Sequence, residues 1–294
     1  MAEYSPDVLK QLQNAEVDML EVFVRVCEKY HIDYFAVYGT AIGCLRHQGF
    51  IPWDDDIDIG MLWKDYQKLR AVPKDEWGES IILCDPSDDN ENHYFPYPRL
   101  YRLGTTLLPE SFSSVRDRKR NNTGITYNGI WIDILIYHRF RTVEEMQGAK
   151  KQAITLRKQY LYSKKEKIVG MEHGILRKLI ALGQNVYSKL TNLTHKAPEK
   201  AIWEKYMSLF EDKGEIITTV DYPYNNCPER TMLQENEIFP LINVRFDRLT
   251  LKLPKDIDKN LRNIYGNYME LPPEKDRVNH APKYLDLGNG AVIE

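Results

Sequence analysis

Residues 49–60, which read GFIPWDDDIDIG, constrain this chain most, because they place four carboxylates within five positions. From Asp56 onward apolar residues alternate with acids, and this alternation predicts a β-strand. In a strand, side chains two positions apart share a face and lie roughly 6.6–7 Å apart. We therefore expect Asp54, Asp56 and Asp58 to share one face, with the isoleucines between and after them pointing into a core.

Carboxylates on one face of a strand repel each other by about 2.4 kcal/mol per pair at roughly 7 Å and an effective dielectric near 20. A folded domain has little reason to keep this repulsion unless a positive group lies between the acids. Mg²⁺ is usually held by one or two carboxylates plus substrate phosphates. We expect Asp56 and Asp58 to bind Mg²⁺ or Mn²⁺, with Asp54 behind them and Asp55 pointing away. A solvated acidic turn is the alternative, since Pro-Trp-Asp-Asp is also typical of a loop.

The composition is that of an ordinary globular protein, with 43% hydrophobic and 28% charged residues among 294. A net charge of −3 argues against nucleic acid as a partner. The first ten residues are polar and unlike a secretory leader, and no apolar run reaches the ~18–20 residues that span a bilayer. The four cysteines show no CxxC spacing. These features predict a reduced, cytoplasmic protein.

The apolar patterns predict an α+β fold in which a mixed β-sheet is flanked by helices. Helices are expected over residues 5–31, 41–46, 63–69 and 256–265, and strands over residues 34–38, 56–61, 81–83, 99–103, 125–128, 130–136, 244–246 and 249–253. Asn128-Gly129 predicts a hairpin turn between two of these strands. We divide the chain into a catalytic core (residues 1–141), a basic helical segment (142–212) and a C-terminal segment that packs on the core (213–294).

The basic helical segment carries a large charge excess. Residues 150–200 contain twelve Lys or Arg and three Glu, a net charge of +9 within a chain of net charge −3. This asymmetry favours a surface that faces a polyanion or an anionic membrane, which would place the protein at the inner face of the membrane. A solvated helical face explains the same charges equally well.

Two further elements could meet the acids of residues 54–58. Gly39 and Thr40 lie between a predicted strand and a predicted helix, where backbone amides can bind phosphate. Asp133 is a single carboxylate within a run of Ile, Leu and Trp, and it is costly to bury unless it is paired or binds a metal. A salt bridge to a buried arginine is the alternative for Asp133. Together these elements would supply what a metal-dependent phosphoryl-type transfer needs.

Donor phosphates would also need positive or aromatic partners. The arginines that could neutralise phosphate are Arg46, Arg99 and Arg102, each of which could instead be an ordinary surface or salt-bridging residue. Of these we prefer Arg102. His280, in a loop rich in Pro and charge, could line the same pocket. Tyr38 and Trp53 could stack on a base or surround a quaternary ammonium, with core packing as the alternative.

The same residues closely resemble the signature of the LicD family. The matching segments are residues 38–43 (YGTAIG), 46–61 (RHQGFIPWDDDIDIGM), 131–134 (WIDI), 238–241 (IFPL), 264–269 (IYGNYM) and 271–273 (LPP). The resemblance covers nearly the whole chain and is specific in the PWDDDID block. Residues 150–200 are the least recognisable part.

This resemblance implies a nucleotidyltransferase-like fold and an enzyme that transfers phosphocholine, or a similar phospho-alcohol, from CDP-choline or a related CDP-alcohol. The acceptor would be a hydroxyl of a cell-surface glycan, such as teichoic acid or lipopolysaccharide, or its lipid-linked precursor, and CMP would leave. The expected catalytic and metal-binding residues are Asp56, Asp58 and Asp133. The expected donor-binding residues are Gly39, Thr40, Arg46, Arg102 and His280. Fukutin-type transferases are distant relatives, and the zinc site that some of them carry is not supported by the cysteine spacing here.

Three alternatives remain at this point. The chain could attach a nucleoside monophosphate and release pyrophosphate, it could bind nucleotides without catalysis, or it could bind a membrane surface. Within the favoured class, the sequence leaves open whether the donor carries choline, ethanolamine or a polyol.

Overall fold

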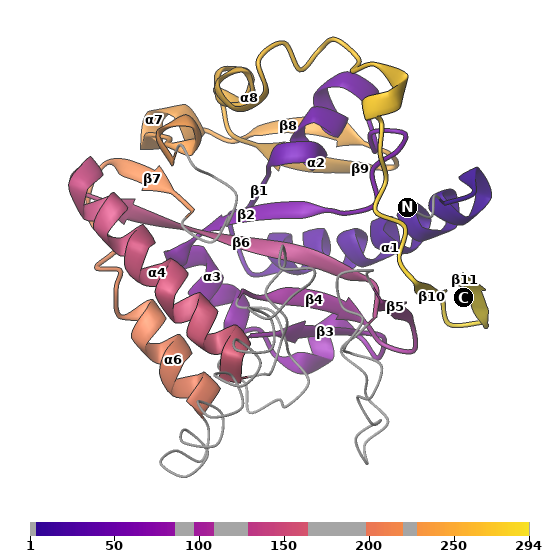
Figure 1. Ribbon diagram of the computed structural model, residues 1–294, viewed down its shortest axis with the longest axis horizontal. Helices are drawn as coiled ribbons and strands as arrows, with labels where there is room; N and C mark the ends of the chain where they lie inside the picture. Colours follow the sequence, from indigo (N-terminus) through magenta and orange to yellow (C-terminus); the bar gives the residue numbers. More distant parts are fainter. Residues whose placement is uncertain (1–3, 86–96, 109–128, 164–197, 220–227, 294) are drawn as a thin grey trace, which may run out of the picture.

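The computed structural model describes residues 4–85, 97–108, 129–163, 198–219 and 228–293. A mixed β-sheet forms the centre (Figure 1), with the strand order β1-β2-β6-β4-β3 and with β7 paired to β6. These strands are β1 (Phe35–Ala36), β2 (Asp58–Leu62), β3 (Ile81–Cys84), β4 (Arg99–Arg102), β6 (Trp131–Phe140) and β7 (Ile216–Thr218). Strands β2 and β6 pair in parallel, and the other pairs are antiparallel. The predicted α+β class is confirmed.

Helices lie on both sides of this sheet, and smaller sheets complete the fold (Figure 1). The helices are α1 (Pro6–Lys29), α2 (Tyr38–Ile42), which continues as the π-helical turn η1 (Gly43–His47), α3 (Trp63–Arg70), α4 (Val143–Ser163), α6 (Pro198–Met207), α7 (Glu235–Ile238) and α8 (Ile257–Tyr265). The short 3₁₀ helices are η2 (Lys74–Trp77), η5 (Pro228–Thr231) and η6 (Glu274–Asp276). Strands β8 (Ile242–Phe246) and β9 (Leu249–Leu253) form a hairpin, while β5 (Thr106–Leu108), β10 (Tyr284–Asp286) and β11 (Ala291–Ile293) form a third sheet.

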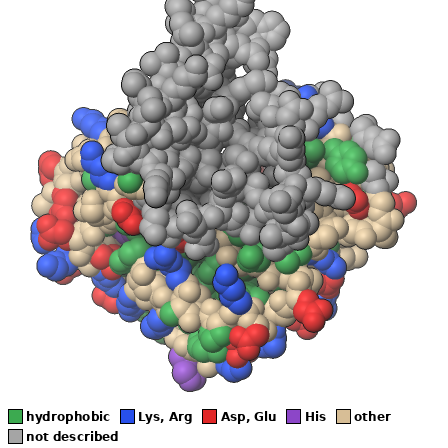
Figure 2. Space-filling view, turned by 90° about the horizontal axis from the view of Figure 1, so that it is seen from below, with side chains coloured by type: hydrophobic (Ala, Val, Ile, Leu, Met, Phe, Trp, Pro, Cys, Tyr) green, Lys and Arg blue, Asp and Glu red, His purple; other side chains and the backbone are tan. Residues whose placement is uncertain are grey.

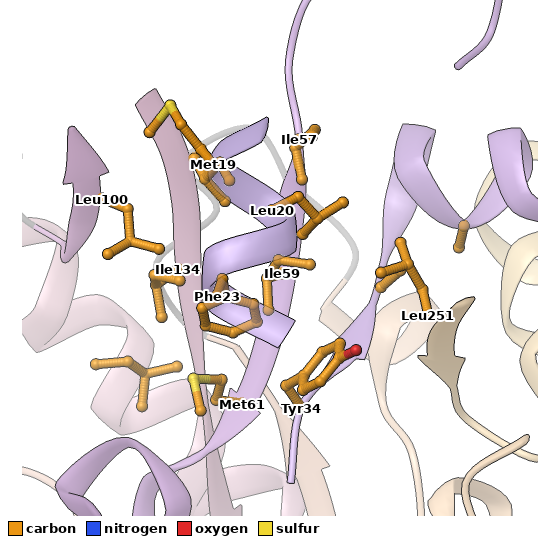
Figure 3. Close-up of a cluster of buried hydrophobic side chains, with 14 of the residues drawn as sticks. Met19, Leu20, Phe23, Tyr34, Ile57, Ile59, Met61, Leu100, Ile134 and Leu251 are labelled. Carbon is orange, nitrogen blue, oxygen red and sulfur yellow. The ribbon is translucent and has the colours of Figure 1, made fainter. Parts of the chain in front are cut away.

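Helix α1 begins where the sequence predicts it. Ser5 accepts a hydrogen bond at its Oγ from the backbone N–H of Val8 (3.4 Å), and Pro6 occupies the first helical turn. The helix buries one face against β2, β4 and β6 (Figure 3). The side chains that meet in this core include Met19, Leu20, Phe23, Ile57, Ile59, Met61, Leu100 and Ile134, all of which are buried. The predicted inward direction of Ile57 and Ile59 is therefore confirmed.

Strand β2 begins at Asp58, two residues later than the alternation predicts. The backbone N–H of Asp54 donates to the carbonyl of Ile51 (2.9 Å), which closes a turn just before the acids. Residues 54–57 consequently form a loop that leads into the strand, and strand alternation does not set the direction of their side chains.

Several predictions fall partly or wholly outside the described residues. The second arm of the predicted hairpin is confirmed as β6, but its first arm (residues 125–128) is not described. In the basic helical segment, α4 and α6 confirm helices at both ends, while residues 164–197 are not described. The proposed membrane contact and the three-part division of the chain thus stay predictions.

Two further observations concern the charges on the surface and the character of the helices. On the face shown in Figure 2, basic and acidic side chains are interspersed among the coloured residues. Among the helices of the described ranges, none combines the length and apolar character that crossing a bilayer requires.

Candidate functional site

Three charged residues form a row across adjacent strands of the central sheet. Asp58 on β2 is in register with Asp133 on β6, and Asp133 is in turn in register with Arg99 on β4. Residues in register on neighbouring strands present their side chains to the same face of a sheet. The fold therefore brings together two acids that are 75 positions apart in the sequence and places an arginine beside them.

Asp133 is paired with Arg99. Arg99 donates from Nε to Asp133 Oδ1 and from Nη2 to Asp133 Oδ2 (3.2 Å for the second bond). Both residues are buried, at 3% and 7% exposure, and the Arg99 guanidinium lies 4.3 Å from the centre of the Trp131 ring. Such a two-point contact satisfies a carboxylate that would otherwise be costly to bury. Asp133 therefore forms a salt bridge to a buried arginine, which was the alternative to a metal-binding role.

The acidic loop that precedes β2 is held by residues from α1 and α2. Gln13 on α1 donates from Nε2 to the carbonyl of Asp54 (2.9 Å). The Asp58 backbone N–H donates to Thr40 Oγ1 (2.9 Å), and Thr40 is buried. A methyl group added to Gly39 would lie 2.6 Å from Asp54 Oδ2. The prediction placed Gly39 and Thr40 between a strand and a helix that begins at Ala41, but both residues lie within α2, which begins at Tyr38. From there they face Asp54 and the start of β2.

The acids of the loop repel one another strongly. Burial, followed by the charges of Asp58 and Asp54, raises the pKa of Asp56 well above its ordinary value. Burial, followed by the charge of Asp133, likewise raises the pKa of Asp58 well above its ordinary value. Burial and Asp55 raise the pKa of Asp54 to about 6, although His280 lowers it in part. Asp54, Asp56 and Asp58 remain partly accessible, so a ligand can reach them.

Asp55 does not point away from this site, contrary to the prediction. Its Oδ1 lies 3.3 Å from Nδ1 of His280, and its side chain is only 8% exposed. The hydrogen bond that His280 donates to the Asp55 carboxylate raises the pKa of His280, whose own side chain is 81% exposed. The prediction assumed that residues 54–57 belong to a strand, in which side chains alternate between two faces. These residues form a loop instead, so Asp55 is not turned away from its neighbours. His280, which we expected near the donor pocket, lies at the edge of the acids through this contact.

Glu16 on α1 is a site residue that the sequence pattern did not reveal. It is 2% exposed, and its Oε2 has no hydrogen-bond partner among the described residues. Burial first, and then the charges of Asp56, Asp55 and Asp54, raise its pKa well above the ordinary value. Its position three residues after Gln13 directs it to the same loop, because residues three apart share a helix face.

The remaining predicted residues lie in different surroundings. Arg102, the arginine we preferred, donates to the carbonyl of Ala15 (3.3 Å) and lies 3.5 Å from Asp18 on α1, whereas Arg99 adjoins the acids. Arg46 lies at the C-terminal loop, where it donates to the carbonyls of Tyr268 and Glu270. Tyr38 is buried, in accordance with core packing.

Among the described residues, no group of three or more His, Cys, Asp or Glu side chains is arranged to hold a metal ion by itself. Two carboxylates nonetheless suit Mg²⁺, which commonly completes its shell with water and substrate phosphate. Asp56 and Asp58 fit this description, because both are partly accessible acids two residues apart, and the charge of Asp58 raises the pKa of Asp56. The role of Asp133 as a third ligand stays a prediction.

Comparison with known proteins matches residues 31–88 to the family described as LicD/FKTN/FKRP, nucleotidyltransferase domain. The chain is 23% identical over 292 residues to the lipopolysaccharide cholinephosphotransferase LicD of Haemophilus influenzae, and the alignment covers 92% of this chain and 95% of that protein. It is 46% identical over 44 residues to the uncharacterized protein RP689 of Rickettsia prowazekii, covering 15% of this chain and 16% of that protein. The LicD resemblance predicted from the sequence is confirmed.

Proposed function

We propose that the chain is a metal-dependent transferase of phosphocholine or a similar phospho-alcohol, from the premise that residues 31–88 match the LicD/FKTN/FKRP nucleotidyltransferase domain. The donor would be CDP-choline or a related CDP-alcohol, the acceptor a hydroxyl of a cell-surface glycan or its lipid-linked precursor, and the leaving group CMP. The likeness to a lipopolysaccharide cholinephosphotransferase over nearly the full length of both chains supports this substrate class.

The observation that carries the proposal is the charge imbalance at the acidic loop. Besides Asp54, Asp55, Asp56 and Asp58, the carboxylates of Glu16 and Asp133 contribute to this imbalance. Within the part of the chain that the structure describes, Arg99 and His280 are the basic side chains that contact these acids. An excess of buried negative charge is unfavourable unless a cation compensates it. A divalent cation together with a phosphate-bearing donor would complete this site.

In the proposed reaction, some residues would bind the cation and others position the acids. Asp56 and Asp58 would hold Mg²⁺ or Mn²⁺, and the bound ion would neutralise charge on the donor phosphates. Thr40 accepts from the backbone N–H of Asp58, and Gln13 donates to the backbone carbonyl of Asp54. These two contacts hold the backbone on either side of Asp56 in place before a ligand binds. Positioning of this kind lowers the reorganisation needed during transfer.

In the transfer itself, the acceptor oxygen forms a bond to the phosphorus that bears the choline-like group. The bond between that phosphorus and the CMP oxygen breaks, and the acceptor proton passes to a base. We propose Asp133 for this base, because its place in register with Asp58 puts it next to the residues that would hold the donor. Arg99 would keep its carboxylate oriented toward the same face of the sheet.

The proposal is tested by replacing Asp56→Asn and Asp58→Asn and measuring CMP release from CDP-choline with an acceptor glycan and Mg²⁺. Each variant should lose at least about 100-fold in kcat/KM, as expected when a charge-stabilising group is removed from an active site. Asp75→Asn, at an exposed residue of η2, is the matched control and should keep full activity. Folded Asp56 and Asp58 variants with wild-type turnover that EDTA does not reduce would contradict the metal role.

The name of the matched family domain favours one second candidate, a nucleotidyl transfer. In that reaction the nucleoside monophosphate is attached to the acceptor and pyrophosphate leaves. The same assay separates the two reactions, since release of pyrophosphate from a nucleoside triphosphate, with no CMP from CDP-alcohols, would favour nucleotidyl transfer.

A further inference from the structure

A group of basic and aromatic side chains borders the acidic loop, and we refer to Arg46, His47, Trp53 and Arg277 together as the basic rim. Arg46 donates from Nε to His47 Nε2 (2.8 Å). The His47 and Trp53 rings meet edge to face at 6.5 Å, and the Arg277 guanidinium lies 5.3 Å from the centre of the Trp53 ring. The basic rim is thus one continuous set of contacts, although its members come from η1, the loop before β2 and the C-terminal loop.

The two arginines of the basic rim have no carboxylate partner among the described residues. Arg46 donates from Nη1 to the carbonyl of Glu270 (3.2 Å) and to that of Tyr268, and Arg277 donates from Nε to the carbonyl of Pro272 (2.9 Å). Burial, and then the charge of Arg277, lower the pKa of Arg46. Backbone carbonyls therefore hold two like charges within reach of each other.

These contacts leave part of each guanidinium available. Within the described chain, no hydrogen bond uses Nη2 of Arg46 or either Nη group of Arg277. His47 accepts at Nε2 and is therefore neutral there, so it orients Arg46 without adding charge. Arg277, whose Nε is fixed and whose two Nη groups are open, can bind a phosphate oxygen pair, and Nη2 of Arg46 can donate to a further phosphate oxygen.

The basic rim lies directly beside the acids that would hold a cation. Trp53 precedes Asp54 in the sequence, and His280, three residues after Arg277, contacts Asp55. A ligand that spans both regions would need negative charge for the rim and oxygen atoms for a cation at the acids. A diphosphate group has both properties.

Trp53 contributes a second constraint. Its ring already faces the Arg277 guanidinium, so a quaternary ammonium would have to displace Arg277 to reach this face. The stacking instead fixes Arg277 at the edge of the acidic loop. This favours an anionic group at the basic rim over the cationic end of the donor.

We infer that Arg46 and Arg277 form a phosphate subsite that binds the diphosphate of the nucleotide donor beside the acidic loop. The identification of the ligand as the donor rests on the proposed function, whereas the binding of phosphate follows from the basic rim itself. Arg46 was among the residues expected from the sequence, and Arg277 is new to the site.

The inference is tested by isothermal titration of the full chain with pyrophosphate in EDTA, so that no divalent cation contributes. Wild-type protein should bind, and Arg46→Gln and Arg277→Gln should each weaken binding at least tenfold. Arg245→Gln is the matched control, because the Nε of exposed Arg245 also donates to a nearby backbone carbonyl, that of Asp247 (3.1 Å). The control should bind pyrophosphate as the wild type does.

Two results would overturn the inference: wild-type protein that does not bind pyrophosphate, or folded Arg277→Gln protein with unchanged affinity. Arg277→Lys is a second variant that keeps the charge and loses the planar fork, and it should bind with intermediate affinity. Asp56→Asn should still bind pyrophosphate in EDTA, so failure of the metal-dependent transfer and failure of the phosphate subsite are distinguishable.

Discussion

At the scale of single residues, Glu16 shows how helix packing and site chemistry are combined. Glu16 lies four residues from both Leu12 and Leu20, so helical periodicity places it on the apolar face of α1, unlike exposed Glu28. Only the tertiary contact between α1 and the acidic loop makes it a buried carboxylate among other carboxylates. The local pattern therefore indicates that Glu16 is buried, whereas its acidic neighbours depend on long-range packing.

Glu16→Gln should stabilise the protein in EDTA at pH 8, because the substitution removes a buried charge that other acids repel. A carboxyl whose pKa is higher in the folded state than its ordinary 4.5 lowers stability as the pH rises above that ordinary value. We expect a gain of about 1 kcal/mol or more, which is roughly 2–4 °C in Tm for a chain of this size. Thermal unfolding followed by circular dichroism measures it.

The gain from Glu16→Gln should shrink toward pH 4.5, where Glu16 is increasingly protonated in both states. Glu28→Gln on the exposed face of the same helix is the control, and its Tm should follow the wild type at each pH. A Glu16→Gln protein that is less stable than the wild type at pH 8 would show that the carboxylate has a compensating partner.

At the scale of elements, the close approach of α2 to the acidic loop depends on a glycine within the first turn of α2. A Cβ at Gly39 would meet Asp54 Oδ2 at 2.6 Å, so Gly39→Ala should displace the Asp54 carboxylate while the helix still forms. We expect roughly 10–100-fold lower kcat/KM, since a displacement of about 1 Å at an active site has effects of this size. The CMP-release assay measures the loss.

Gly148→Ala is the matched control for Gly39→Ala. Gly148 lies in α4, where an added Cβ meets no atom within 4 Å. Alanine should there stabilise the helix by about 0.5–1 kcal/mol without affecting turnover. Equal activity of both glycine variants would contradict the proposed importance of the Asp54 position.

Local patterns predicted most described elements, because helix caps, apolar periodicity and β-branched runs act over a few residues. The positions of α1, β2, α3, β6 and α8 agree with this pattern to within a few residues. The register that places Asp133 between Asp58 and Arg99 was not predictable in the same way, since it depends on which strands pair. For the same reason the sequence did not indicate that Arg99, and not Arg102, adjoins the acids, while the preference for Arg102 as a phosphate ligand stays a prediction.

At the scale of the whole molecule, the site joins both ends of the described chain. The backbone N–H of Tyr4, before α1, donates to Oδ1 of Asn279 (3.4 Å), and Figure 1 shows the C-terminal segment descending past the start of α1. The same segment brings Arg277 and His280 to the acidic loop. Sequence motifs identified the acids, but Arg277 and His280 reach them from a segment more than 200 residues away.

The central claim, that Asp56 and Asp58 hold a divalent cation, is tested most directly by titrating Mn²⁺ into the protein and following free Mn²⁺ by electron paramagnetic resonance. We predict one Mn²⁺ per wild-type chain, bound more tightly when CDP-choline is present, and at least tenfold weaker binding in Asp56→Asn and in Asp58→Asn. Wild-type protein that binds no Mn²⁺ with or without CDP-choline, or variants that bind it as tightly as the wild type, would contradict the claim.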